Sequence, residues 1–180
     1  MLKLNTAIRR ARYFHQQVDE AVTSFKSTLS NPELIRCKKG CSACCHTGAG
    51  VTEDEAELMA SLINGGLSID HGKLERQVSA KNWYSLSYEE RGCIFLNENK
   101  ECRIYHDRPA VCRTNHVLSD PKFCETKDGI EQTQRVLLTE EANMLIAASF
   151  IAAKKTGTLS ALVFKKLQEK NLRSFSPMID

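Results

Sequence analysis

The chain has 180 residues, of which 42% are apolar, and this is enough for one compact domain with a substantial hydrophobic core. Its 25 Lys and Arg residues nearly balance 22 Asp and Glu residues, so the formal net charge of +3 is too small to predict a nucleic-acid partner. No apolar run approaches the ~20 residues that cross a bilayer, which excludes a membrane-spanning segment and predicts no membrane partner.

The N-terminal part, residues 1–30, predicts a long amphipathic helix. Apolar residues recur at steps of three and four from Leu4 to Leu29, and Pro32 follows the end of this pattern. Basic residues interrupt every apolar run of the first positions, so the apolar stretch of a secretory signal is missing and we expect a cytoplasmic protein. The alternative is an organellar leader, because residues 1–15 carry four basic groups and no acid.

Two helices are expected within residues 52–80. Thr52 and Glu55 have the spacing of a capping box, which predicts a helix that begins at Thr52. Gly65-Gly66 ends this helix. The segment from Asp70 to Ala80 carries apolar residues on one face and predicts a second, shorter helix.

Residues 83–128 show no helical period. Two short apolar pieces, "CIFL" and "CRIY", flank the polar "NENK", and this pattern predicts a small hairpin within an irregular loop region. Proline at 109 fits the first turn of a short helix that carries Cys112. A loop of about 45 residues is unusual inside a compact domain unless something besides hydrophobic packing orders it. Metal ligation would supply such order.

The C-terminal part, residues 131–170, again predicts helices. One runs from about Thr133 to Lys155 with Gly157 as its stop, and a last one is capped by Thr158 and continues through Leu167. Residues 171–180 predict a loose tail. The expected fold class is therefore mostly α, as a single compact helical domain over residues 1–180 with an irregular cysteine-rich metal-binding centre and at most a small hairpin.

Eight cysteines are a high number for this length, and four of them lie in the cluster at residues 37–50, which contains "CKKGCSACCH". The candidate ligands are Cys37, Cys41, Cys44, Cys45, Cys93, Cys102, Cys112 and Cys124. A disulfide framework demands an oxidising compartment, which the N-terminus does not indicate. A catalytic thiol needs a base within reach, and neighbours such as Cys45 and His46 rarely bring their side chains together. Metal ligation fits the cysteines best.

The spacing within the cluster favours a metal shared by several thiols. Cys41-x-x-Cys44 lets two sulfurs of one turn meet at one ion, and Cys37 can add a third. Adjacent Cys44 and Cys45 diverge from the backbone, so one of them binds a second metal, bridges two metals or lies elsewhere. A zinc ribbon would add a second CxxC pair, whereas iron–sulfur clusters accept ligands from scattered loops. An iron–sulfur cluster and zinc both remain candidates.

Basic residues crowd the cysteines, either as a solvated basic face or as cations that offset the charge of a metal–thiolate centre. These residues are Arg36, Lys38, Lys39, Arg91, Lys100, Arg103, Arg108 and Arg113. Arg108 and Arg113 are candidates to bind thiolate sulfur or backbone carbonyls. His46, His106 and His116 could each replace a cysteine as ligand, but eight thiols make them unnecessary.

The segments "CKKGCSACCHTGAGVTEDEAELMA" and "GCIFLNENKECRIYHDRPAVCR" resemble the cysteine-cluster (CxxCxxCC, YkgJ-type) family, whose members are described as zinc- or iron-chelating. The resemblance runs from about Arg36 to Cys124 and includes all eight cysteines. It implies a metal ion or cluster as partner, with a protein partner as a further expectation. One branch is similar to flagellin lysine N-methylases, which implies the alternative of a small iron–sulfur protein-modifying enzyme. No strand with a glycine-rich turn indicates a nucleotide cofactor, and no catalytic residue is assigned.

Overall fold

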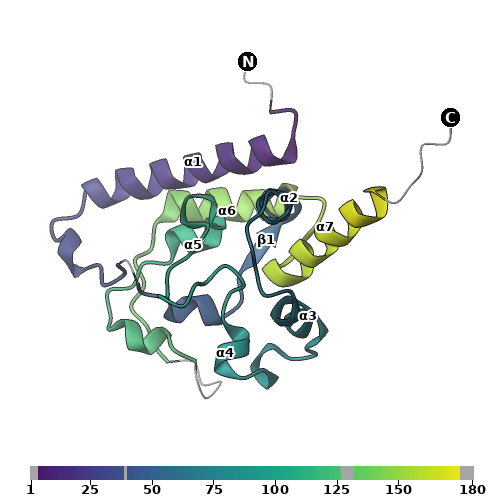
Figure 1. Cartoon of the computed structure of the whole chain (residues 1–180). Helices are drawn as coiled ribbons and strands as arrows, with labels where there is room; N and C mark the ends of the chain where they lie inside the picture. The colour runs from purple at the N-terminus through teal and green to yellow at the C-terminus, as the bar shows by residue number, and fades with distance from the viewer. Residues whose placement is uncertain (1–3, 39, 127–131, 175–180) are drawn as a thin grey trace.

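The computed structural model describes residues 4–38, 40–126 and 132–174 (Figure 1). It confirms the mostly α fold class. None of the helices in these ranges is long and apolar enough to cross a membrane. The elements in chain order are α1 (Ala7–Ser27), η1 (Pro32–Leu34), η2 (Ala43–His46), β1 (Gly50–Thr52), α2 (Glu53–Asn64), α3 (His71–Ser79), η3 (Trp83–Ser85), α4 (Tyr88–Arg91), η4 (Tyr105–Asp107), α5 (Ala110–Thr114), η5 (Pro121–Cys124), α6 (Glu140–Ala152), β2 (Thr156–Thr158) and α7 (Leu159–Ser174).

The long helix α1 covers one side of the molecule. Thr6 caps its N-terminus by accepting a hydrogen bond from the backbone N–H of Arg9 at 3.2 Å. In Figure 1 it lies along the top, packed on α2, α5 and α6. Its apolar stripe, centred on Val18 and Val22, forms one buried cluster with Ala110 of α5 and Ala142 of α6. α1 therefore holds α5, which carries one of the cysteines, against the body of the fold.

A second and larger cluster joins α2, α3 and α7. The predicted capping box at the start of α2 is confirmed, because Thr52 and Glu55 each bind the other's backbone N–H, at 2.9 and 3.4 Å. α2 ends at Asn64, directly before the predicted glycine pair. Its buried side chains pack with Leu74 of α3 and Val163 of α7. Segment 93–104 closes this cluster with Phe95 and Ile104.

The prediction of one helix from Thr133 to Lys155 is wrong at both ends. Residues 132–139 are not helical, and Val136 forms an isolated antiparallel bridge with Val117. α6 ends at Ala152, and Gly157 lies in β2 opposite Val51 instead of stopping a helix. In both places the backbone bonds to a segment far away in the chain, and this tertiary pairing overrides the local helical period.

The C-terminal helix α7 is longer than predicted. Thr158 lies at its start, as expected, and accepts a hydrogen bond from the N–H of Ala161 at 3.4 Å. The helix continues to Ser174, so the first part of the predicted tail is helical. The rest of that tail, 175–180, lies outside the described residues.

The predicted irregular region is built from short elements, and its described part is residues 83–126. A small antiparallel bridge between Leu96 and Cys102 supplies the expected hairpin. Buried arginines tie the region together. Arg91 donates to the side chain and the carbonyl of Thr126 at 2.9 and 2.6 Å, and Arg113 donates to the carbonyls of Arg108 and His106 at 3.0 and 2.6 Å. Hydrogen bonds from the arginine side chains thus help to order this segment, in addition to the predicted metal ligation.

Candidate metal centre

The first four cysteines lie on a tight turn that leads into η2. Gly40 takes a φ of +83°, a left-handed conformation that favours glycine, and it lets the chain reverse before Cys41. The N–H of Cys41 donates to the carbonyl of Lys38, and the N–H of Cys45 donates to that of Ser42, both at 2.9 Å. These local bonds hold the cysteine side chains around one short segment of backbone.

One group of thiols gathers where η2 packs on η5. Cys37 lies against a buried cluster that contains Ala43, Val117 and Cys124, and its sulfur accepts the N–H of Val117 at 3.3 Å. Burial, together with the charges of three nearby cysteines, raises the pKa of Cys124 to about 11. These four residues, Cys37, Cys41, Cys44 and Cys124, are called the first thiol set.

A second group gathers at the edge of the larger apolar cluster. The N–H of Cys93 donates to the carbonyl of Cys45 at 2.9 Å, and Cys102 lies across the small hairpin from Leu96. Burial raises the pKa of Cys112, and the thiolates of Cys93, Cys44 and Cys102 add to the rise. We call Cys45, Cys93, Cys102 and Cys112 the second thiol set.

Cys44 and Cys45 lie at the boundary between the two sets. The interaction with Cys45 lowers the pKa of Cys44 to about 7, and the same interaction raises the pKa of Cys45. Cys44 is close enough to raise the pKa of thiols in both sets, such as Cys124 and Cys112. The charges of Cys93 and Cys112, both of the second set, add to the rise in the pKa of Cys45. Cys44 therefore lies near thiols of both sets.

All eight cysteines are free thiols. Within residues 4–38, 40–126 and 132–174, no three His, Cys, Asp or Glu side chains are arranged closely enough to hold an ion as they stand. The thiols of each set are electrostatic neighbours, and their side chains have to turn toward one another to share a metal. The described structure thus packs Cys37 with Cys124 and Cys93 with Cys102, without placing three ligands in ligating geometry.

A comparison with protein families matches residues 36–136 to the CxxCxxCC model, described as "Putative zinc- or iron-chelating domain". The match spans more than half of the chain and includes every cysteine. The chain belongs to the CxxCxxCC family. No match was found among curated proteins or among solved structures. The family description indicates a metal as the partner of this CxxCxxCC chain.

Lys and Arg side chains from several elements lie near the thiols of the CxxCxxCC domain. Burial raises the pKa of Cys37 and of Cys93, and the ammonium groups of Lys26 in α1 and Lys73 in α3 oppose these rises. Arg108 and Arg113 act on Cys102 in the same way. The sequence pointed to both arginines, but it carried no signal for the two lysines, because α1 and α3 are remote in the chain. The sequence also carried no signal for the Asn115 side chain, which lowers the pKa of Cys44.

The three candidate histidines have structural partners. The Nδ1 of His46 lies 3.1 Å from the carbonyl of Ser42, an acceptor, so Nδ1 carries the proton, and the ring stacks on Tyr88 with centroids 4.0 Å apart. The Nε2 of His116 accepts from Lys26 at 2.7 Å, because burial and the charge of Lys26 lower the pKa of His116 to about 4. His106 sits with its ring against Tyr105.

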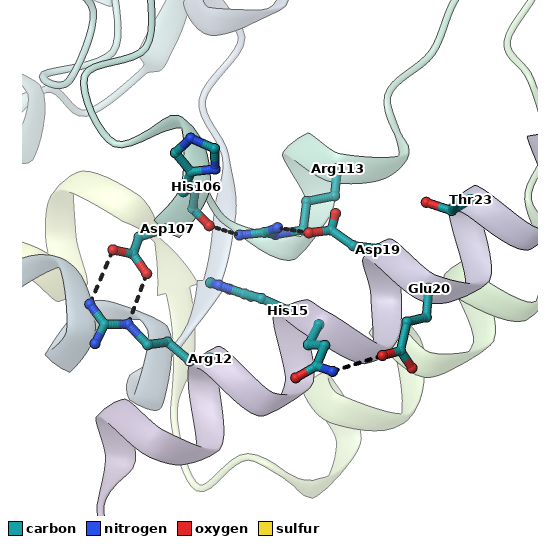
Figure 2. Close-up of a pocket in the computed structure, with 9 residues that line it drawn as sticks. Arg12, His15, Asp19, Glu20, Thr23, His106, Asp107 and Arg113 are labelled. Carbon is teal, nitrogen blue, oxygen red and sulfur yellow. Dashed lines mark hydrogen bonds and ion pairs between the residues drawn. The ribbon is translucent and has the colours of Figure 1, made fainter.

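A polar pocket of about 540 Å³ lies between α1 and the segment that leads into α5. Figure 2 shows its two ionic links, in which Arg12 pairs with Asp107 at 3.0 and 3.2 Å and Arg113 pairs with Asp19. His15 lines the pocket and donates from Nε2 to Glu55. These contacts fix α5, and with it Cys112 of the CxxCxxCC domain, against α1.

Proposed function

We propose that this CxxCxxCC domain chelates metal in two adjoining centres, one bound by the first thiol set and the other by the second. The observation that carries the proposal is that Cys37 lies with Cys124 at one buried cluster, whereas Cys93 and Cys102 pack against another. Four thiolates complete the shell of a structural zinc ion, and four also bind a four-iron cluster. A single centre of four ligands would leave half of the thiols without a role.

The charges around the thiols fit such ligands. A divalent ion in four thiolates carries a net charge of about −2, and an oxidised four-iron cluster in four thiolates carries the same. Lys26 lies beside the first set, while Lys73, Arg108 and Arg113 lie beside the second. When bound, zinc would crosslink the short elements of each set, and an iron–sulfur cluster would add one-electron chemistry. The chain's own residues orient the thiols and offset their charge.

The experiment is to measure iron, zinc and acid-labile sulfide per chain in anaerobically purified protein. Two centres predict about two zinc ions per chain, or about four iron atoms with four sulfides for each set. Cys37→Ser is expected to remove the metal of the first set only, and Cys112→Ser that of the second only. Ser42→Ala, between the cysteines, is the control and should leave the metal content unchanged.

Two results would overturn the proposal. Protein that contains neither iron nor zinc, and whose eight cysteines titrate as free thiols, would exclude chelation. Complete loss of metal from either single substitution, in protein that stays folded by circular dichroism, would show one shared centre instead of two.

The alternative role, an iron–sulfur enzyme that modifies protein lysines, makes a separate prediction. Such an enzyme binds S-adenosylmethionine and labels a protein substrate, whereas a chelating module shows no turnover. Titration of the metal-loaded chain with labelled S-adenosylmethionine distinguishes the two. We propose the chelating role because the thiol grouping supports it directly.

A further inference from the structure

Helix α6 has two apolar faces, and only one of them is covered by the described residues. On the inner face Ala142 is buried, while Leu145 and Ile146 pack on the cluster that contains Val18 of α1. The other face, called the outer face of α6, consists of exposed residues on one side of the helix: Glu140, Glu141, Met144, Ala147, Ala148, Ile151 and Ala152. Met144 is 66% exposed and Ile151 is 86% exposed. Helices with apolar residues all round are normally buried.

The outer face is bounded by opposite charges at its two ends. Glu140 and Glu141 form the first turn of α6, and Lys154 and Lys155 follow directly after its last turn. All four are exposed, and none of them forms an ion pair with another described residue. The face therefore runs from an acidic end through an apolar middle to a basic end.

This pattern is complementary to itself when a second copy runs in the opposite direction. With a two-fold axis between Ala147 and Ala148, Met144 of one copy faces Ile151 of the other, and each acidic end faces a basic end. The smallest side chains lie at the axis, where two helices approach to about 8–10 Å. A parallel arrangement would instead place the acidic ends together. Charge and side-chain size thus select the same antiparallel register.

We propose that the outer face of α6 binds a second copy of this chain, and that the two α6 helices pack antiparallel about a two-fold axis at Ala147 and Ala148. The proposal is independent of the metal centres, because none of the cysteines lies on α6. One helix pair of about 20 Å buries less than a standard protein interface. A reversible dimer with a Kd of about 1–100 µM is therefore expected.

Sedimentation velocity of the full chain over a range of concentrations tests the proposal. Ile151→Glu places a charge in the apolar middle and is expected to weaken self-association by about tenfold or more. Met144→Glu, the residue across the axis, should have the same effect. Leu172→Glu on α7 is the matched control, because Leu172 is 72% exposed but lies on a different helix, and it should leave the dimer unchanged. Circular dichroism and metal content verify that each variant folds like the wild type.

Charge reversal tests the orientation. A variant with Glu140→Lys and Glu141→Lys has only basic ends, and one with Lys154→Glu and Lys155→Glu has only acidic ends, so each is expected to dimerise more weakly than wild type. An equimolar mixture of the two variants restores opposite charges at both ends and should recover association as a heterodimer.

Three outcomes would overturn the proposal. The first is a wild-type chain that stays monomeric up to about 200 µM. The second is a dimer that Ile151→Glu and Met144→Glu weaken no more than Leu172→Glu does. The third is a mixture of the two charge-reversed variants that associates no better than either variant alone.

Discussion

Glu55 joins three parts of the fold, and its replacement is the most informative stability test. Its carboxylate is 1% exposed and accepts hydrogen bonds from His15 on α1, from the N–H of Ala110 at the start of α5, and from the N–H and hydroxyl of Thr52. The four distances are 3.0, 2.8, 2.9 and 3.0 Å. The substitution Glu55→Ala leaves these donors buried without an acceptor.

The size of the effect follows from those orphaned donors. Each buried donor without a partner costs about 1–3 kcal/mol, and removal of one member of a buried charged pair costs about 3–5 kcal/mol in total. We therefore expect Glu55→Ala to lower the free energy of unfolding by about 3–5 kcal/mol, which corresponds to roughly 6–20 °C in Tm for a chain of this size. Glu55→Gln keeps the shape of the side chain but turns an amide N–H toward another donor. We therefore expect it to lower the free energy of unfolding by about 1–3 kcal/mol.

Urea unfolding followed by circular dichroism measures these changes, with metal content matched between variants. Glu57→Ala is the control on the same helix. Its carboxylate is partly exposed and lies 3.7 and 3.6 Å from Lys166 and Lys170, so a change within about 1 kcal/mol is expected. Equal effects of Glu55→Ala and Glu57→Ala would refute the role given to Glu55.

The same residue predicts a pH dependence. Burial by itself would raise the pKa of Glu55, but the hydrogen bonds from His15, Thr52 and Ala110 outweigh it and hold the pKa below its ordinary value. A carboxyl whose pKa is lowered by folding stabilises the protein above the unfolded pKa of about 4.3, and this contribution is lost as the pH falls through the folded pKa. The stability difference between wild type and Glu55→Ala should therefore shrink in acid. A difference that grows below about pH 4 would contradict this reasoning.

Three further predictions concern the metal centres and the fold. Cys41→Ser or Cys44→Ser should lower the metal content and increase proteolysis of residues 83–126, because metal binding contributes to the folding of that segment; unchanged metal content with unchanged protease resistance would exclude these ligands. Arg91→Met removes the hydrogen bonds to Thr126. It should lower the free energy of unfolding, measured by heat or urea, by about 3 kcal/mol. A loss below about 0.5 kcal/mol would show that the guanidinium does not order the loop. Gly157→Val should lower the free energy of unfolding by about 1–3 kcal/mol, because a Cβ at this position lies 3.3 Å from the Leu162 side chain. An unchanged Tm would show that β2 adjusts freely.

Local signals in the sequence predicted those elements whose structure depends on neighbouring residues. The capping box at Thr52, the stop at the glycine pair and the start of α7 near Thr158 are all set by contacts within three or four positions. The helix predicted from Thr133 failed at its start because the residues before α6 bond to a segment near Val117, and no local pattern reports such a partner.

The sequence by itself determined the helical class, the eight thiols and the family to which the chain belongs. It left open how the thiols group, because adjacent Cys44 and Cys45 have identical side chains and the remaining cysteines are widely spaced. Only the tertiary structure packs Cys37 beside Val117, 80 positions away, and bonds the N–H of Cys93 to the carbonyl of Cys45. It also brought Lys26 and Lys73 to the thiols. Spacing along the chain cannot encode these contacts, since they arise only when separate helices bury their apolar faces together.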